Sequence, residues 1–484
     1  MSERLESINF KRIGLIVGIA LLLVMAVIGL RIYDFFLTDE PKLHADVIEH
    51  FKYGSIGSDR VGLPYWIWLV LPDVFPDLLP DGSGEGYERM GFLFESESHQ
   101  RPIGTSYREK PIPRVGVNCA VCHTGTVRET PESSEQIILG MPANQFDLQS
   151  YVQFLFATAR DERFNAGTLL SAIGGKNADF SLLNRLFYRF LVIPRLKEGL
   201  ITQSEDFIWM ESIPVQGPGR VDTFALYKVV SGLDDDTVGT VDLPSLWNQR
   251  VREGMSLHWD GNNDSVDERN LNAAIGAGGV RNMEDALDHE GINRVAQWIR
   301  DLPSPGFPQD KIDGSRVEAG RGTFQTYCAQ CHSSDGAYIG QVTDIDEIGT
   351  DRERFDSFTQ ELADRLNTVG EGQPWQFSHF RKTNGYANMP LDGLWLRAPY
   401  LHNGSVPTLR DLLNPPEERP KVFYRGYDVY DFDNLGFISN GPEAERLGFK
   451  YDITERGNGN QGHEYGTSLS QQEKNDLLEF LKTQ

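Results

Sequence analysis

The 484-residue chain has only four cysteines and far fewer basic than acidic residues. Lysine and arginine number 46 against 70 aspartates and glutamates, which gives a formal net charge of −24. Like charges repel, so nucleic acid is not an expected partner. The charge instead favours a cationic protein or a neutral substrate as the partner. A simpler interpretation is that the acidity only keeps the protein soluble.

Two common catalytic motifs are also missing from the sequence. The Gly-containing loops "GSGEGYERMG" and "GKNADF" are not followed by Lys-Ser/Thr at the spacing of a phosphate-binding loop. No G-x-S-x-G nucleophile elbow of a serine hydrolase occurs. These absences exclude a phosphate-binding loop and this type of hydrolase.

Long apolar runs are absent except for "IGLIVGIALLLVMAVIGL" at residues 13–30. A helix of this length is about 27 Å long, close to a hydrocarbon core of about 30 Å. Basic residues precede the run and mostly acidic ones follow it, which predicts that the bulk of the chain is exported. These flanking residues are Arg4, Lys11, Arg12, Arg31, Asp34, Asp39 and Glu40.

We expect this run to be an uncleaved single-pass anchor in the inner membrane. A cleaved signal peptide, the alternative, has a shorter apolar run and a small-x-small cleavage site. "GLRIYDFF" offers no such site. Residues 1–39 would then form a cytoplasmic stub and transmembrane signal-anchor, with the rest on the periplasmic side of a bacterial cytoplasmic membrane.

All four cysteines lie in two C-x-x-C-H motifs, "NCAVCHTGT" (118–126) and "YCAQCHSSD" (327–335). This motif is the attachment signature of c-type haem. Two thioethers hold the porphyrin, and the histidine supplies a nitrogen to the iron. A shared zinc site or a redox-active dithiol would leave the adjacent histidines without a role. The sequence thus predicts two covalently bound haem c groups, held by Cys119, Cys122, His123, Cys328, Cys331 and His332.

The sixth ligand of each iron decides between electron transfer and chemistry on O₂ or peroxide. For the second haem three residues qualify: His463 in a Gly-rich loop, Met389 in "GYANMPLDG", and His402 in "APYLHNGSVPTL". Spacing alone does not choose between His463 and Met389. For the first haem only Met141 is a candidate sixth ligand.

The pattern predicts a mainly α fold made of two cytochrome c-type domains with long irregular loops. We expect an N-terminal domain at 40–303 with a helical insertion at 145–200, and a C-terminal domain at 304–484. Gly320, Phe324 and Cys328 recur every four residues before the second motif, as on one helix face. Ser470 and Glu473 form a capping-box pattern, which predicts the start of a C-terminal helix. Residues 292–305 predict another helix, the one that ends the first domain.

Three segments carry a family resemblance. "LWLRAPYLHNGSVPTL" resembles the bacterial di-haem cytochrome c peroxidase and MauG-like superfamily. "SLHWDGNNDSVDERNLNAAIGAG" (256–278), "MPLDGLWLRAPYLHNGSVPTLRDLLNP" and "GNGNQGHEYGTSLS" are similar to the di-haem rubber (latex) oxygenases. The resemblance runs from about residue 100 to the C-terminus.

This resemblance implies that the haem of His123 is the reactive one, with catalytic roles for His123 and Trp259. It further implies that His463 is the sixth ligand of the iron bound by His332, so that the second haem transfers electrons. Two departures stand out. Ala274 occupies a place where the oxygenases have a bulky aromatic residue, and those enzymes are secreted rather than anchored.

Two functions therefore remain open at this point. The first is an oxidoreductase that activates O₂ or peroxide at the haem of His123, with a redox partner protein or a small or polymeric apolar substrate. The second is a pure electron-transfer cytochrome that feeds or drains a membrane respiratory complex.

Overall fold

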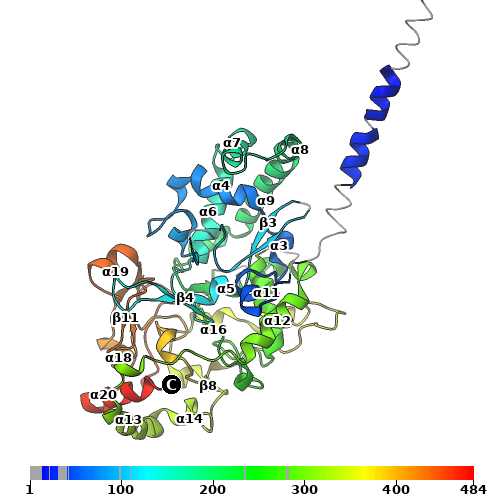
Figure 1. Ribbon diagram of the computed structural model, residues 1–484. Helices are drawn as coiled ribbons and strands as arrows, with labels where there is room; N and C mark the ends of the chain where they lie inside the picture. Colours follow the sequence, from blue (N-terminus) through cyan, green and yellow to red (C-terminus); the bar gives the residue numbers. More distant parts are fainter. Residues whose placement is uncertain are drawn as a thin grey trace, which may run out of the picture.

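The computed structural model in Figure 1 describes residues 13–20, 22–30, 41, 43–96, 100–110, 112–233, 236–279 and 283–484. Within these ranges one helix, Ile13–Leu30, is long and apolar enough to cross a membrane, and no part of it is buried in the protein. The flanking charges, Arg4, Lys11, Arg12, Arg31, Asp34, Asp39 and Glu40, lie outside the described residues.

The expectation of a mainly α fold is wrong. The protein is 46% helical and 11% strand, a mixed α/β structure with several small sheets. Its strands are two to four residues long. An alternation of apolar and polar residues needs a longer run than this to stand out in a sequence. Hairpins this short are not distinguishable from irregular loops in the sequence.

The strands of the described residues form one three-stranded and five two-stranded antiparallel sheets. The larger sheet has the order β1-β3-β2, with Thr105 of β2 opposite Val117 of β3. The strands are β1 (Leu63–Pro64), β2 (Thr105–Arg108) and β3 (Arg114–Val117); β4 (Thr124–Val127) with β5 (Gln136–Leu139); β6 (Arg220–Asp222) with β7 (Thr240–Asp242); β8 (Val342–Asp344) with β9 (Gly385–Ala387); β10 (Val422–Arg425) with β13 (Phe449–Asp452); and β11 (Tyr430–Asp431) with β12 (Gly436–Phe437).

The helices are distributed along the whole chain. They are α2 (Val47–Tyr53), α3 (Ser58–Val61), α4 (Tyr65–Val74), α5 (Cys119–Cys122), α6 (Leu148–Arg160), α7 (Ala166–Lys176), α8 (Leu182–Phe187), α9 (Ile193–Asp206), α10 (Ala225–Ser231), α11 (Val266–Gly278), α12 (His289–Arg300), α13 (Gly314–Tyr327), α14 (Ala329–His332), α15 (Ile345–Ile348), α16 (Glu353–Ser357), α17 (Gln360–Leu366), α18 (Leu409–Leu412), α19 (Pro442–Leu447) and α20 (Gln471–Leu481). Figure 1 shows α4 and α6–α9 at one end of the body, α5, α11 and α12 in the middle, and α13, α14 and α20 at the opposite end.

The helices expected at 145–200 are present as α6–α9. They pack with α4 around a large apolar cluster that contains Trp68, Phe154 and Ile173. The helix expected at 292–305 is α12, which ends at Arg300. Its residues Val295 and Ile299 are buried, and Trp298 is partly buried.

The crossing of α13 and α20 next to the second motif follows the sequence pattern closely. A Cβ on Gly320 would lie 1.9 Å from the carbonyl oxygen of Asp476, so only glycine allows this approach of the two helices. The Ser470 hydroxyl and the Glu473 carboxylate form the predicted capping box at the start of α20. The two helices thus hold α14, which carries Cys331 and His332.

The apolar clusters extend across residue 303. One contains Val127, Met141 and Trp247 together with residues of 307–481, and another joins Phe224 and Ala274 to Phe358 and Phe380. The division into 40–303 and 304–484 stays a prediction.

Candidate haem centres

The first motif lies on the single turn of α5. Asn118 caps this turn, because its side-chain oxygen accepts a hydrogen bond from the Ala120 amide at 3.0 Å. Its amide nitrogen donates to the Gly54 carbonyl at 2.9 Å, which ties the turn to the end of α2. Cys119 and Cys122 are three residues apart on this turn, so their thiols lie on neighbouring positions of one helix face.

Both motif histidines are oriented by a backbone carbonyl. The Nδ1 of His123 lies 2.8 Å from the Pro244 carbonyl oxygen, and the Nδ1 of His332 lies 2.8 Å from that of Met389. A carbonyl can only accept, so each Nδ1 carries the proton and each Nε2 keeps a lone pair. Metal-bound histidines are oriented by this type of bond.

Burial keeps these imidazoles neutral. It lowers the pKa of His123 to about 4, with a smaller contribution from the nearby Arg269 cation. The pKa of His332 is also lowered, again mainly by burial. Neutral imidazole is the form that binds iron.

The four thiols suit thioether bonds better than a zinc-thiolate site. All four cysteines are free, and burial raises the pKa of Cys119 to about 11, of Cys122 to about 12 and of Cys328 to about 11. A thioether carries no charge and loses nothing in such surroundings, whereas a thiolate does. Among the described residues, no group of three or more His, Cys, Asp or Glu side chains is placed to hold a metal ion.

His463 faces the histidine of the second motif. The ring centroids of His332 and His463 are 6.2 Å apart, with 44° between the planes. Histidine nitrogens bind first-row metals at about 2.0 Å and the ring centre lies roughly 1.1 Å behind the nitrogen, so two imidazoles on one metal have centres about 6 Å apart. The observed spacing fits one iron held between the two rings.

A strained loop brings His463 to this position. Gly462 and His463 both have positive φ, +77° and +50°. A Cβ on Gly462 would lie 2.4 Å from the backbone of Gly349 and Thr350, so the loop requires glycine there. The His463 amide donates to the Ile348 carbonyl at 2.9 Å. Its buried Nδ1 has no hydrogen-bond partner in the described part of the chain. Strain of this kind is typical of a ligand-holding loop.

The other candidate ligands lie elsewhere. The Met389 backbone carbonyl accepts from His332 Nδ1, on the side of that ring away from Nε2. His402 is buried and stacks on Tyr386 at 4.3 Å between ring centroids. Met141 is fully buried in the apolar cluster around Trp247.

Trp259 links the supports of the two motif histidines. Its indole Nε1 donates to the Asp242 carbonyl at 2.9 Å, and its own carbonyl accepts from the Ala387 amide at 2.8 Å. Asp242 ends β7 two residues before Pro244, and Ala387 ends β9 two residues before Met389. Trp259 therefore connects the two short strands whose following residues orient His123 and His332.

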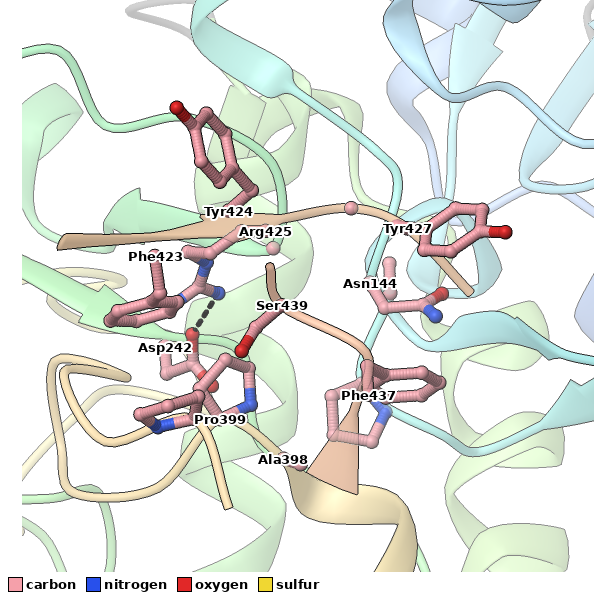
Figure 2. A pocket seen from close by; sticks show the side chains of 15 residues that line it. Asn144, Asp242, Ala398, Pro399, Phe423, Tyr424, Arg425, Tyr427, Phe437 and Ser439 are labelled. Atoms are coloured by element: carbon pink, nitrogen blue, oxygen red, sulfur yellow. Dashed lines mark hydrogen bonds and ion pairs between the residues drawn. The ribbon is translucent and has the colours of Figure 1, made fainter. Parts of the chain in front are cut away.

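A buried ion pair reinforces this junction. Figure 2 shows the Asp242 carboxylate bound to the Arg425 guanidinium below β10. Burial raises the pKa of Asp242, and Arg425 opposes that shift. The Asp242 amide also donates to the His402 carbonyl at 2.8 Å. The adjoining cavity is about 20 Å³, room for about one water molecule.

The surroundings of the first motif are apolar. Ala274 of α11 is fully buried in a cluster with Phe224, Leu271 and Ile275, and Cys119 packs against this cluster. In the described part of the chain, the His123 ring makes no ring contact with another imidazole like that between His332 and His463. The two motifs, alike in sequence, thus have different surroundings.

His258 is a site residue that the sequence reasoning missed. It lies at φ +62°, and its ring contacts the edge of Phe224, with 5.8 Å between centroids. Phe224 belongs to the apolar cluster against which Cys119 packs, so His258 borders the surroundings of the first motif. Its place directly before Trp259 was the only signal in the sequence.

A chain of hydrogen bonds determines the tautomer of His258. Arg354 pairs with Asp260 at 3.1 Å, and the Asn262 amide nitrogen donates to the same carboxylate at 2.9 Å. The Asn262 oxygen therefore faces His258 Nδ1, 2.5 Å away, which must carry the proton. Burial lowers the pKa of His258 to about 4, so its Nε2 keeps a free lone pair at neutral pH.

Comparison with known families places a c-type cytochrome signature beside this site. Residues 385–424 match the family model described as "RoxA-like, cytochrome c-like". This segment contains Ala387, Met389 and His402. The match supports a c-type cytochrome related to the RoxA-like proteins, and a cytochrome c-like domain implies covalently bound haem c.

Two similar proteins come from Sinorhizobium fredii (strain NBRC 101917 / NGR234). The uncharacterized protein y4iJ is 25% identical over 92% of this chain and 85% of its own length. The uncharacterized protein y4iM is 34% identical over 41% of this chain and 49% of its own length. Neither name states an activity.

Proposed function

We propose that the protein is a membrane-anchored periplasmic di-haem oxidoreductase. In this proposal the haem of His123 activates O₂ or peroxide, and the haem of His332, closed by His463, transfers electrons. Support for the location comes from the apolar helix Ile13–Leu30 and from the usual extracytoplasmic place of cytochrome c domains.

The observation that carries the proposal is the difference between the two motif histidines. His332 faces His463 at a spacing suited to two iron–nitrogen bonds. In the described part of the chain His123 faces no second imidazole, and Cys119 of the same motif packs against the apolar cluster of Ala274 and Phe224. Two strong protein ligands leave an iron only electron transfer, whereas an open position permits chemistry on a bound molecule.

The side chains around the first motif have separable roles. Bound haem would supply the redox chemistry at an iron held by His123. The apolar wall with Ala274 excludes water from the surroundings of the first motif. The free Nε2 of His258 accepts a hydrogen bond or a proton in these surroundings, because Asn262 holds the proton on Nδ1. Trp259 fixes the two carbonyl supports relative to one another.

A pure electron-transfer cytochrome is the second candidate function. It is favoured by the apolar anchor helix, which would keep a carrier close to membrane complexes, and by the link through Trp259 between the two centres. In this case both irons would have two protein ligands.

Electron paramagnetic resonance of the oxidised full-length protein distinguishes the two functions. The oxygenase or peroxidase proposal expects one high-spin and one low-spin iron per chain, and carbon monoxide binding to one of the two reduced haems. Two low-spin irons and no carbon monoxide binding would establish the electron carrier instead. A haem content of one per chain would contradict both.

A further inference from the structure

The helical lobe at residues 166–206 has an uncovered apolar face. Helix α8, a five-residue π-helical turn (Tyr188–Val192) and α9 form one continuous helix from Leu182 to Asp206. Leu182 and Phe190 are each 73% exposed, and Leu183 and Leu186 are 51% and 46% exposed. Isolated exposed leucines are ordinary, but a contiguous group of this kind marks an interaction surface.

The opposite face of the same helix is buried against the rest of the lobe. Tyr188, Val192 and Ile193 are buried in the cluster around Trp68 and Phe154. The π-helical turn precedes Pro194, which has no amide hydrogen to donate to the turn before it. A helix that is apolar on all sides is normally buried on all sides. Here one side remains open.

The charge of this segment is opposite to that of the whole protein. Residues 181–197 contain four basic side chains and no acidic one, although the chain carries −24. Arg189 and Arg195 are exposed, and the guanidinium of Arg185 is turned inward to the Phe180 carbonyl at 3.1 Å. Apolar and cationic side chains together fit an anionic, apolar-cored partner.

The chain itself keeps this lobe close to a lipid surface. The apolar helix ends at Leu30, and from there to Leu43 is 43 − 30 = 13 residue steps. Such a segment spans at most about 45 Å. If Ile13–Leu30 crosses a bilayer, the body must lie beside it.

We propose that the exposed face formed by Leu182, Leu183, Leu186 and Phe190 docks on an anionic phospholipid bilayer, the one that the N-terminal helix spans. The apolar side chains enter the boundary between headgroups and acyl chains, and Arg189 and Arg195 contact phosphates. The lobe lies at the end of the body opposite to α13, α14 and α20 (Figure 1). Docking therefore directs the second C-x-x-C-H motif away from the membrane, toward soluble partners.

Photo-crosslinking to lipid tests this contact on the full-length chain. The protein is reconstituted into vesicles of phosphatidylethanolamine and phosphatidylglycerol that contain a diazirine-labelled phospholipid, and lipid adducts are mapped by mass spectrometry. We expect adducts on both 13–30 and 181–197. The double variant Leu182→Ser, Phe190→Ser should lower the adducts on 181–197 about tenfold or more and leave those on 13–30 unchanged.

Two comparisons separate the apolar from the electrostatic contribution. Arg189→Gln should lower the adducts on 181–197 about fivefold in the phosphatidylglycerol vesicles, with no change in vesicles of phosphatidylcholine alone. The matched control Val251→Ser, Val422→Ser removes two exposed apolar side chains from other elements, 56% and 42% exposed, and should have no effect.

The same measurement can overturn the inference. Adducts on 13–30 with none on 181–197 would refute docking and keep the anchor. Adducts on 181–197 with none on 13–30 would keep docking and refute the anchor. In the same sparsely loaded vesicles, chain-to-chain links through 181–197 formed by an added bifunctional cross-linker would show that a second copy covers this face. A haem content or spin state that differs from the proposed function leaves these outcomes unaffected.

Discussion

Replacement of His463 by glycine is the most direct test of the two-site arrangement. The ring of His463 stands 6.2 Å from that of His332, centroid to centroid, so its removal takes away one of two nitrogen ligands and leaves a gap of one imidazole. The expected result is conversion of the second iron to high spin. Since the proposal includes one high-spin iron already, the low-spin signal of the whole protein should disappear.

The backbone should tolerate this change. His463 has φ +50°, a conformation that costs a non-glycine residue on the order of 1 kcal/mol and costs glycine nothing. The free energy of unfolding should therefore change by no more than about 1–2 kcal/mol. A lost signal cannot then be attributed to unfolding, and added imidazole should restore the low-spin spectrum by filling the gap.

The matched control is His379→Gly. His379 is exposed, and its ring pairs with Asp264 at 2.6 Å rather than with a residue of either motif. Its replacement should leave both iron signals intact. A bis-imidazole low-spin signal could also persist in His463→Gly without added imidazole. That result would show that another residue is the sixth ligand of this iron, and it would refute the argument from ring spacing.

Three further predictions concern other side chains. Trp259→Phe removes the indole donor to the Asp242 carbonyl; stopped-flow reduction should show slower electron exchange between the haems with unchanged spin states, and an unchanged rate would remove Trp259 from the path. His258→Leu removes the free Nε2 near the first motif; the iron–carbonyl stretching frequency of the reduced carbon monoxide complex should shift, and an unshifted frequency would show that His258 does not face the bound ligand. His402 has its pKa lowered to about 3 by burial, so its neutral form stabilises the fold fully above about pH 6.5 and this stabilisation is lost as the pH falls toward 3. The difference in unfolding free energy between the wild type and His402→Leu should shrink by about 2 kcal/mol between about pH 7.5 and pH 5, and an unchanged difference would contradict the burial argument.

The sequence alone predicted those features that depend on residues close together in the chain. Two C-x-x-C-H motifs, the helix face of Gly320, Phe324 and Cys328, and the Ser470–Glu473 capping box each depend on residues within a few positions of one another. The structure contains the helix contact and the capping box, and it orients both motif histidines. Such features can be predicted from the sequence because one or two turns of helix determine them.

The backbone carbonyls that orient the two motif histidines could not be predicted from the sequence in the same way. Pro244 and Met389 act through backbone carbonyls, for which the side chain gives no signal. The strands that place them, β7 and β9, are three residues long, pair with β6 and β8, and are joined to each other through Trp259. His258 was overlooked for a related reason, because its orientation depends on Asn262, Asp260 and Arg354, the last of which is nearly a hundred positions away.

The contrast between the two motifs therefore arises outside the motifs. Each has a helical turn that presents two thiols and a histidine oriented by a carbonyl that follows a short strand. Opposite His332, the 457–466 loop can bring in His463 only because Gly462 fits against Gly349 and Thr350 without a side chain. A Gly462→Ala substitution should expel that loop and leave the second iron as open as the first, even though every haem-attachment residue is unchanged. Under the proposed function, specialisation of one haem for electron transfer would thus depend on backbone clearance at a single glycine, 130 positions beyond the motif that it serves.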